Sequence, residues 1–185
     1  MEDRTVVFID EAGFYMLPSV VKTFAPEGET PVVKGSASRD HVSAISAITP
    51  EGRLLTSMQE EAFDRHDIAD FLRHVLRHIE GKMLIIWDGL PAHRSQKVKD
   101  LLSEMVGNTE GRVYLEQLPG YAPDLNPDEG IWQYLKNVEL KNVCFETLEA
   151  LRKQLRLAFK RLRHKTEVIT GCFGLAGLSL AGLDL

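Results

Sequence analysis

The chain has 185 residues, of which 44% are hydrophobic and 26% charged, so it can bury a core of its own and wholesale disorder is excluded. Its two cysteines, Cys144 and Cys172, form no CxxC or Cys/His cluster, which excludes a zinc module and a disulfide framework. The net charge is −5, but residues 141–185 hold 8 Lys and Arg against 4 Asp and Glu. We therefore expect one domain with an acidic body and a basic C-terminal segment.

Short β-rich runs between turn residues predict a series of strands. The run Met83–Trp87 is apolar throughout, which is typical of a strand buried on both faces of a sheet. Turn clusters at residues 26–28 and 50–52 separate the first strands and favour an antiparallel meander. The predicted strands are Thr5–Asp10, Val20–Phe24, Pro31–Val33, His41–Ile48, Arg53–Met58, Met83–Trp87 and Val113–Leu118.

Apolar residues at helical spacing predict helices between and after the later strands. The first predicted helix has Asp64 as its N-cap, with Asp67 three residues on, and Gly81 ends it. The second runs from the cap Ser95 to Gly107. A meander followed by alternating strands and helices predicts an α/β domain with a mixed sheet flanked by helices.

Two further helices are predicted in the last third of the chain. One begins with Asn126 as N-cap and Pro127 at the first helical position. The other is a basic helix at residues 146–165, with an apolar inner face. The apolar stretch Val168–Leu183 contains four glycines, so we expect neither a good helix nor a membrane span there.

Three acidic residues stand where the sites of α/β proteins usually form. Asp10 ends the first predicted strand, Asp88 directly follows Met83–Trp87, and Glu129 lies in the first turn of a helix. If the strands before Asp10 and Asp88 are parallel neighbours, the two carboxylates lie side by side and repel each other unless a cation joins them. A ligand set made only of oxygen suits Mg²⁺ or Mn²⁺ and not zinc.

Each of these acids also has an ordinary structural interpretation. Asp10 and Asp88 could be turn residues, and Glu129 could form a reciprocal capping box with Asn126. His74 and His78 have a spacing of four that can bind a metal on a helix, but they flank the apolar stripe and a solvated face is the favoured interpretation.

The sequences that flank these acids carry a family resemblance. The segments FIDEAGF, FAPEGETP, WDGLPAHRS and LPGYAPDLNPDEGIWQYLK resemble the catalytic domain of DDE transposases, in the bacterial insertion-sequence branch of the mariner superfamily. The resemblance extends from Val6 to about Leu178 and implies an RNase H-like fold with a mixed five-stranded sheet. It also implies that Asp10, Asp88 and Glu129 form the catalytic and metal-binding triad.

Two residues near the triad are possible accessories. His93 matches a position where the family usually has histidine, although a loop histidine bonded to a backbone carbonyl is an equal alternative. Asp128 stands where the family commonly has an apolar residue. This departure leaves open which of the two neighbouring acids, Asp128 or Glu129, is the third ligand.

The resemblance implies two Mg²⁺ or Mn²⁺ ions about 4 Å apart that clamp a scissile phosphodiester. Asp10 is the expected bridging ligand, with Asp88 on one ion and Glu129 on the other. The implied reaction is cleavage at transposon ends, followed by joining of the 3′-hydroxyl to target DNA. Two sets of cations are expected to contact DNA. Two of these cations lie beside the triad. The others form one face of the basic helix, which could equally be an ordinary solvated face. These residues are Arg94, Lys136, Arg152, Lys153, Arg156, Lys160 and Arg163.

Family members normally carry N-terminal helix-turn-helix domains, for which residues 1–185 leave no room, so a single catalytic domain is expected. The chain is then a truncated piece or a second reading frame whose partner is an upstream-frame helix-turn-helix polypeptide. We expect a homodimer in the active complex, a location in the cytoplasm at the nucleoid, and no membrane partner. Two alternatives stay open: a catalytically silent DNA-binding or assembly module, and another RNase H-like nuclease.

Overall fold

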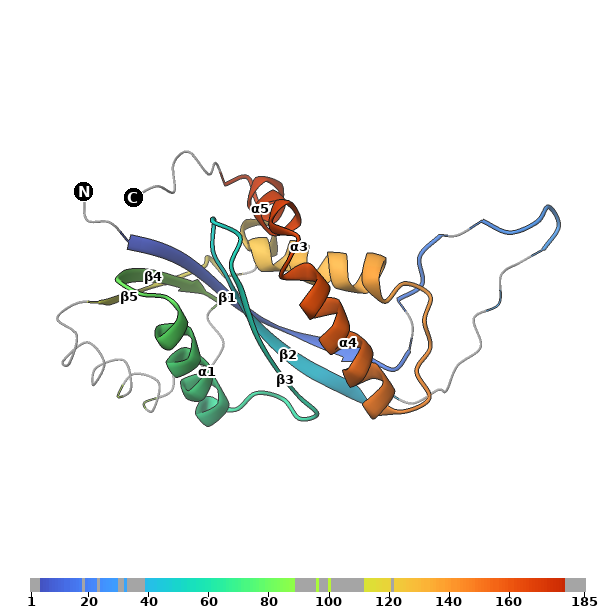
Figure 1. Ribbon diagram of the computed structural model, residues 1–185, viewed down its shortest axis with the longest axis horizontal. Coiled ribbons are helices and arrows are strands. Elements are labelled where there is room, and N and C mark those ends of the chain that lie inside the picture. Colours follow the sequence, from blue (N-terminus) through green and yellow to red (C-terminus); the bar gives the residue numbers. More distant parts are fainter. Residues whose placement is uncertain are drawn as a thin grey trace.

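A mixed five-stranded sheet organises the fold (Figure 1). The computed structural model describes residues 4–17, 19–22, 24–29, 32, 39–88, 96, 100, 112–120 and 122–178. The strand order is β3-β2-β1-β4-β5, with β1 antiparallel to β2 and parallel to β4. The strands are β1 (Arg4–Tyr15), β2 (His41–Ile48), β3 (Leu54–Gln59), β4 (Lys82–Trp87) and β5 (Val113–Gln117). The predicted α/β class with a mixed sheet is confirmed.

Helices cover both faces of this sheet, as Figure 1 shows. Helix α1 (Arg65–His78) packs on one face. The other face carries α3 (Pro127–Tyr134), the π-helix η2 (Leu135–Glu139), α4 (Leu148–Leu162) and α5 (Thr166–Leu175), with a 3₁₀ turn η1 (Pro123–Leu125) before α3. No helix in the described ranges is long and apolar enough to cross a bilayer.

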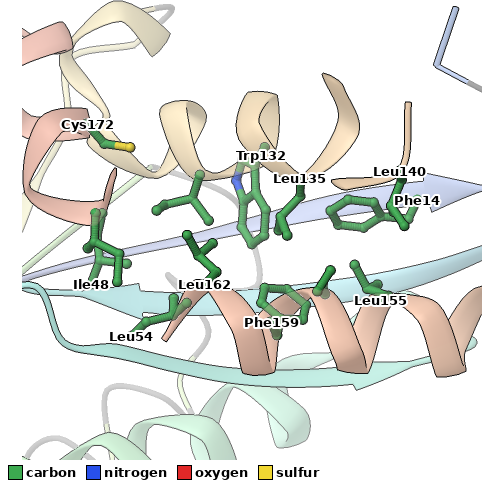
Figure 2. Close-up of a cluster of buried hydrophobic side chains, with 14 of the residues drawn as sticks. Phe14, Ile48, Leu54, Trp132, Leu135, Leu140, Leu155, Phe159, Leu162 and Cys172 are labelled. Carbon is green, nitrogen blue, oxygen red and sulfur yellow. The ribbon is translucent and has the colours of Figure 1, made fainter. Parts of the chain in front are cut away.

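Strand β1 supplies apolar side chains to two separate cores because successive residues of a strand point to opposite faces. Val7 and Ile9 pack with α1, whereas Phe8 and Phe14 pack with α3, α4 and α5. Figure 2 shows the larger core, in which the Trp132 side chain extends from α3 toward the sheet. Burial on both faces explains why the first half of β1 is apolar without alternation.

Several helix predictions are confirmed in detail. The Asp64–Asp67 capping box forms at the start of α1, and Asn126 and Pro127 open α3 as N-cap and first helical residue. The core of the predicted basic helix is α4, whose N-cap is Thr147. These features were predictable because caps and apolar periodicity act within a few residues.

Three strand or helix predictions were wrong. Strand β1 does not end at Asp10, because β2 continues to pair with it as far as Tyr15. The described residues of Val20–Phe24 form no strand. Thr166–Leu175 is a helix despite its glycines, because it buries Ile169 and Phe173 against the rest of the core. Two predictions fall largely on residues that the structure does not describe. Of the helix predicted from Ser95 to Gly107, only Gln96 and Asp100 are described. Of the strand predicted at Pro31–Val33, only Val32 is described.

Helix α5 crosses α3 at a glycine. A Cβ atom placed on Gly130 would lie 2.8 Å from the Sγ atom and 3.0 Å from the Cβ atom of Cys172, closer than carbon and sulfur atoms pack. The crossing therefore depends on the missing side chain at Gly130, and it brings α5 against the first turns of α3.

We predict that Gly130→Ala lowers the free energy of unfolding by about 1–3 kcal/mol, because the added methyl overpacks the α3–α5 crossing. Gly171→Ala on α5 is the matched control, since its Cβ would meet nothing within 4 Å and alanine favours helix. Urea unfolding measures both. Adding Cys172→Ala to Gly130→Ala should recover part of the loss, and equal stabilities for the Gly130 and Gly171 variants would contradict the packing account.

Candidate active site

Asp10 and Asp88 occupy corresponding positions on neighbouring strands. Strands β1 and β4 are parallel and their last paired residues are Ile9 and Trp87, so each aspartate is the next residue of its chain. This confirms that the strands before Asp10 and Asp88 are parallel neighbours. Asp10 itself lies within β1, at the point where β4 leaves the sheet and only β2 continues alongside.

The carboxyl group of Asp10 is buried beneath helix α3. Its residue is 9% exposed, and Oδ2 accepts a hydrogen bond of 2.8 Å from Nε1 of Trp132. Burial raises the pKa of Asp10 from 3.8 to about 6, against the lowering effect of hydrogen bonds from Trp132 and the Glu11 backbone. The negative charges of Glu129 and Asp88 raise that pKa further. The carboxylates of Asp88 and Glu129 therefore lie near enough to Asp10 for their charges to act on it.

The carboxylate of Glu129 is not used to cap its own helix. The backbone N–H of Asn126, which a capping box would need, donates to the Pro123 carbonyl at 2.9 Å instead. The Asn126 side chain accepts from the backbone N–H of Asp128 at 3.2 Å. In this described stretch no hydrogen bond joins the Glu129 carboxylate to Asn126, so the reciprocal capping box does not form.

Glu129 borders a cavity of about 600 Å³ between the start of α3 and helix α5. The cavity has mixed polar and apolar walls, made by Pro123, Asp124, Asn126, Glu129, Gly130, Gln133, Cys172, Leu175 and Ala176. Glu129 is half-buried at the wall of this cavity, so its carboxylate is open to a ligand from that side.

Asp128 points the other way, into the sheet. It is fully buried, and its Oδ1 accepts a short hydrogen bond from the hydroxyl of Ser46 on β2. Its Oδ2 has no hydrogen-bond partner in the described part of the chain. Burial raises the pKa of Asp128 well above its usual value, and the charge of Asp10 adds to this effect. Of the two neighbouring acids, Glu129 is therefore the one that borders open space.

No ready-made metal site exists among the described residues, in which no three His, Cys, Asp or Glu side chains are close enough to share an ion. The donor chemistry nevertheless fits a hard divalent cation. Burial first, and then the charges of two carboxylates, Glu129 and Asp88, raise the pKa of Asp10, and a cation would offset both effects. The predicted residues His93 and Arg94 lie outside the described residues.

His74 and His78 on α1 contact each other and their own helix backbone. His78 Nδ1 lies 2.8 Å from the His74 carbonyl oxygen, and the two rings are 4.2 Å apart. Burial, the main cause, and neighbouring positive groups lower the pKa of His74. These contacts account for the spacing of four without a metal.

The predicted DNA-binding cations of α4 divide into two sets. Arg163 donates to the Thr56 hydroxyl at 2.7 Å, and Arg152 lies 4.0 Å from Glu60, so both arginines contact β3 or the residue just beyond it. The exposed set, here called the α4 basic stripe, has no ion pair with any described residue and lies at helical spacing on the outer face. The α4 basic stripe is Lys153, Arg156 and Lys160.

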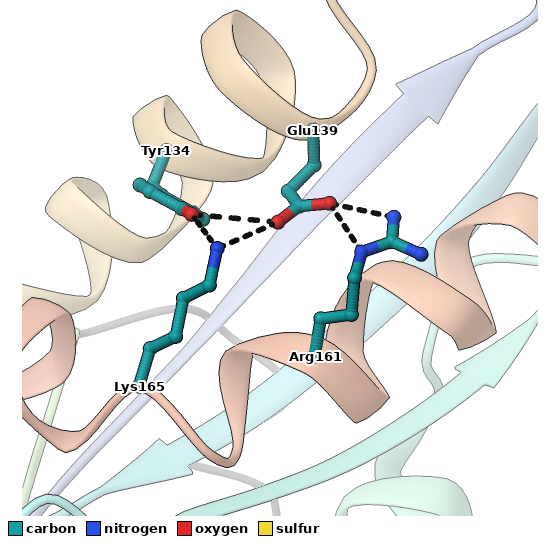
Figure 3. A network of polar contacts seen from close by, with 4 residues as sticks. All are labelled: Tyr134, Glu139, Arg161 and Lys165. Atoms are coloured by element: carbon teal, nitrogen blue, oxygen red, sulfur yellow. Dashed lines mark hydrogen bonds and ion pairs between the residues drawn. The ribbon is translucent and has the colours of Figure 1, made fainter.

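Two other cations hold the C-terminal helices to η2 (Figure 3). The Glu139 side chain, 7% exposed, forms ion pairs with Arg161 at 2.6 Å and Lys165 at 3.5 Å, and Lys165 also donates to the Tyr134 hydroxyl. Hydrogen bonds and charge from the two cations outweigh burial and lower the pKa of Glu139. Lys136, on the same π-helix, lies 5.4 Å from the centre of the Phe14 ring and borders a separate pocket of about 340 Å³.

Sequence reasoning missed the two side chains that hold the site together. Trp132 and Ser46 contact Asp10 and Asp128 from positions 122 and 82 residues away in the chain. The one available signal is that Trp132 follows Asp128 by four residues, which puts both on one face of a helix.

The chain matches one protein family in sequence and several solved structures in fold. A family profile described as DDE superfamily endonuclease matches residues 5–152. The Mos1 mariner paired end complex with Mn superposes with a TM-score of 0.68 at 16% identity, covering 97% of this chain and 56% of that chain. The Mos1 paired-end complex with left transposon end gives 0.65 at 19%, covering 93% and 55%.

The isolated catalytic domain of the Mos1 mariner transposase also superposes, with a TM-score of 0.60 at 16% identity, covering 94% of this chain and 83% of that domain. No curated protein matches the chain in sequence. The chain thus spans about half the length of the transposase chains in the paired-end complexes. At these identities the likeness shows the fold, which is RNase H-like as expected.

We predict that replacing Asp10 with asparagine changes how stability depends on pH. With a folded-state pKa raised from 3.8 to about 6, the folded protein holds an extra proton between these values, so metal-free wild type loses stability as pH rises from 4 to 7. The loss approaches about 3 kcal/mol. Urea unfolding in EDTA should therefore show the Asp10→Asn variant gaining on wild type across this range. A constant difference between the two proteins would contradict the raised pKa of Asp10.

Proposed function

Because the chain belongs to the DDE superfamily endonucleases, we propose that it is the catalytic domain of a mariner-type cut-and-paste transposase. It would cleave phosphodiesters at transposon ends and join the 3′-hydroxyl to target DNA. The observation that carries this proposal is the parallel pairing of β1 and β4, which puts Asp10 and Asp88 at matching positions on neighbouring strands. Glu129 is near enough for its charge to act on Asp10. The similar Mos1 assemblies are named as complexes with Mn and with Mg, which supports a divalent metal in the same role.

Each residue of the site has a proposed role that follows from its position. Asp10, Asp88 and Glu129 would hold the divalent metal, since the charges of Glu129 and Asp88 both act on Asp10. Mg²⁺ or Mn²⁺ bound there would activate a water or hydroxyl nucleophile and stabilise charge at the phosphate. Trp132 fixes one oxygen of Asp10 through its ring N–H, so that this carboxylate keeps one orientation in the buried site.

The α4 basic stripe and Lys136 are the proposed contacts to the DNA backbone. The α4 basic stripe is exposed and forms no ion pair with any described residue, so it can replace the counterions around phosphates at little cost. Arg152 and Arg163 already contact β3 or its end. Lys136 is half-buried beside the Phe14 ring and stays a proposed contact. Arg94 stays a proposed contact beside the triad. We also propose two copies of the chain in the active complex, since two ends must be joined, and a helix-turn-helix polypeptide that reads the end sequence.

A second candidate function is a catalytically silent DNA-binding module. The observation that favours it is that, in the part of the chain that the structure describes, no three acidic or histidine side chains already share a coordination site. DNA binding without cleavage in Mn²⁺ would support this alternative.

We predict that the chain nicks supercoiled plasmid in Mn²⁺ and that Asp10→Asn, Asp88→Asn and Glu129→Gln each lower the rate at least about 100-fold, because each removes a charged metal ligand. Asp70→Asn, an acid on α1 whose side chain is 76% exposed, is the matched control and should nick like wild type. Agarose gels follow the reaction. Nicking that survives Asp10→Asn would contradict the assignment of the site.

We predict that changing Lys153, Arg156 and Lys160 to glutamine weakens binding to random-sequence duplex DNA. The slope of log affinity against log salt should fall by about 2–3, since each lost phosphate contact contributes about 0.9. The control changes three arginines of α1, in the opposite layer of the fold: Arg65, Arg73 and Arg77. Fluorescence anisotropy at several salt concentrations measures both. Equal losses in the two triple variants would show that only net charge matters.

A further inference from the structure

Two hydrogen bonds join one face of helix α3 to two neighbouring strands. Asp128 accepts from the Ser46 hydroxyl on β2, and Trp132 donates to Asp10 on β1 at 2.8 Å. Asp10 and Ser46 are direct partners in the β1–β2 register, so the two strand residues lie opposite each other. Asp128 and Trp132 are four residues apart and share one helix face. The four side chains therefore form two parallel links between α3 and the sheet.

Two links define a helix position better than one. A single hydrogen bond would leave α3 free to rotate about it, whereas bonds from successive turns fix both rotation about the axis and displacement along it. The Asn126 side chain adds a third constraint by capping the backbone N–H of Asp128. Glu129 follows Asp128 directly, so its place beside the cavity is set by how Asp128 is held.

Asp128 carries a cost that an apolar side chain would avoid. It is fully buried, and its Oδ2 has no hydrogen-bond partner among the described residues. An unsatisfied buried polar atom costs about 1–3 kcal/mol. Folding stability alone does not account for an acid here, since a leucine-sized apolar residue would pack between α3 and the sheet without that cost.

We propose that Asp128 is a positioning residue of the active site, which through its bond to Ser46 sets the rotation of α3 and so the place of Glu129 relative to Asp10 and Asp88. This inference rests on the proposed metal-dependent function. Asp128 contacts neither DNA nor metal in this account. It acts through Glu129, as residues behind metal ligands do when they hold a ligand in one orientation.

Three variants separate positioning from the other roles that Asp128 could have. Asp128→Asn keeps an oxygen that accepts from Ser46, at nearly the same size. Asp128→Leu keeps the bulk but removes the acceptor, and Ser46→Ala removes the donor from the other side. If Asp128 were itself a metal ligand, Asp128→Asn would weaken Mn²⁺ binding and Ser46→Ala would not.

The test is the affinity of the full chain for Mn²⁺ alone, measured by calorimetry without DNA at a temperature where every variant is folded. We expect Asp128→Leu and Ser46→Ala to raise the Kd about 10-fold and Asp128→Asn to stay within about twofold of wild type. The double variant with Ser46→Ala and Asp128→Leu should be no worse than either single variant, since both remove the same bond. Melting curves run alongside identify any loss that reflects stability alone.

The contrary results are distinct. Wild-type affinity in Asp128→Leu, or a lowered melting temperature with unchanged Kd, would overturn the positioning role and leave the proposed function standing. A weakened Asp128→Asn together with an unaffected Ser46→Ala would overturn it in favour of direct ligation. Failure of the wild-type chain to bind Mn²⁺ at millimolar concentration would overturn the proposed function, and this inference with it.

Discussion

The burial of one carboxylate near two others is the constraint on which the site depends. Burial under α3, the main cause, and the charges of Glu129 and Asp88 raise the pKa of Asp10 to about 6. Without a counter-charge, ionising this group costs folding free energy. A divalent cation bound here would remove the cost, so the same arrangement favours metal binding.

Contacts in the surrounding fold prevent these carboxylates from moving apart. Parallel pairing of β1 and β4 places Asp10 and Asp88 at matching positions, and α3 is tied to β1 and β2 by Trp132 and Asp128. Helix α5 in turn packs against α3 at Gly130, and the Glu139 ion pairs join η2 to the C-terminal helices. The C-terminal layer therefore supports the helix that carries Glu129.

The features predicted correctly from the sequence are those with local causes. The Asp64 cap and the Asn126–Pro127 start each depend on a few neighbouring residues. The length of β1 and the existence of α5 depend on partners far along the chain, so local patterns gave the wrong result. The acids Asp10, Asp88 and Glu129 were proposed from their positions and their flanking segments, and they stay a proposal. Ser46 and Trp132 could not be proposed in this way, because their roles come from contacts over 82 and 122 residues.

The most direct test of the central claim is to locate Mn²⁺ in crystals of the chain by anomalous scattering. The account predicts at least one peak within inner-sphere distance of Asp10 and of Asp88 or Glu129, at about 2.0–2.4 Å from the carboxylate oxygens. A peak on Asp128 with none on Glu129 would show that the wrong neighbouring acid was assigned. Complete absence of manganese from these carboxylates at a saturating Mn²⁺ concentration would contradict the claim that they form a metal-binding site.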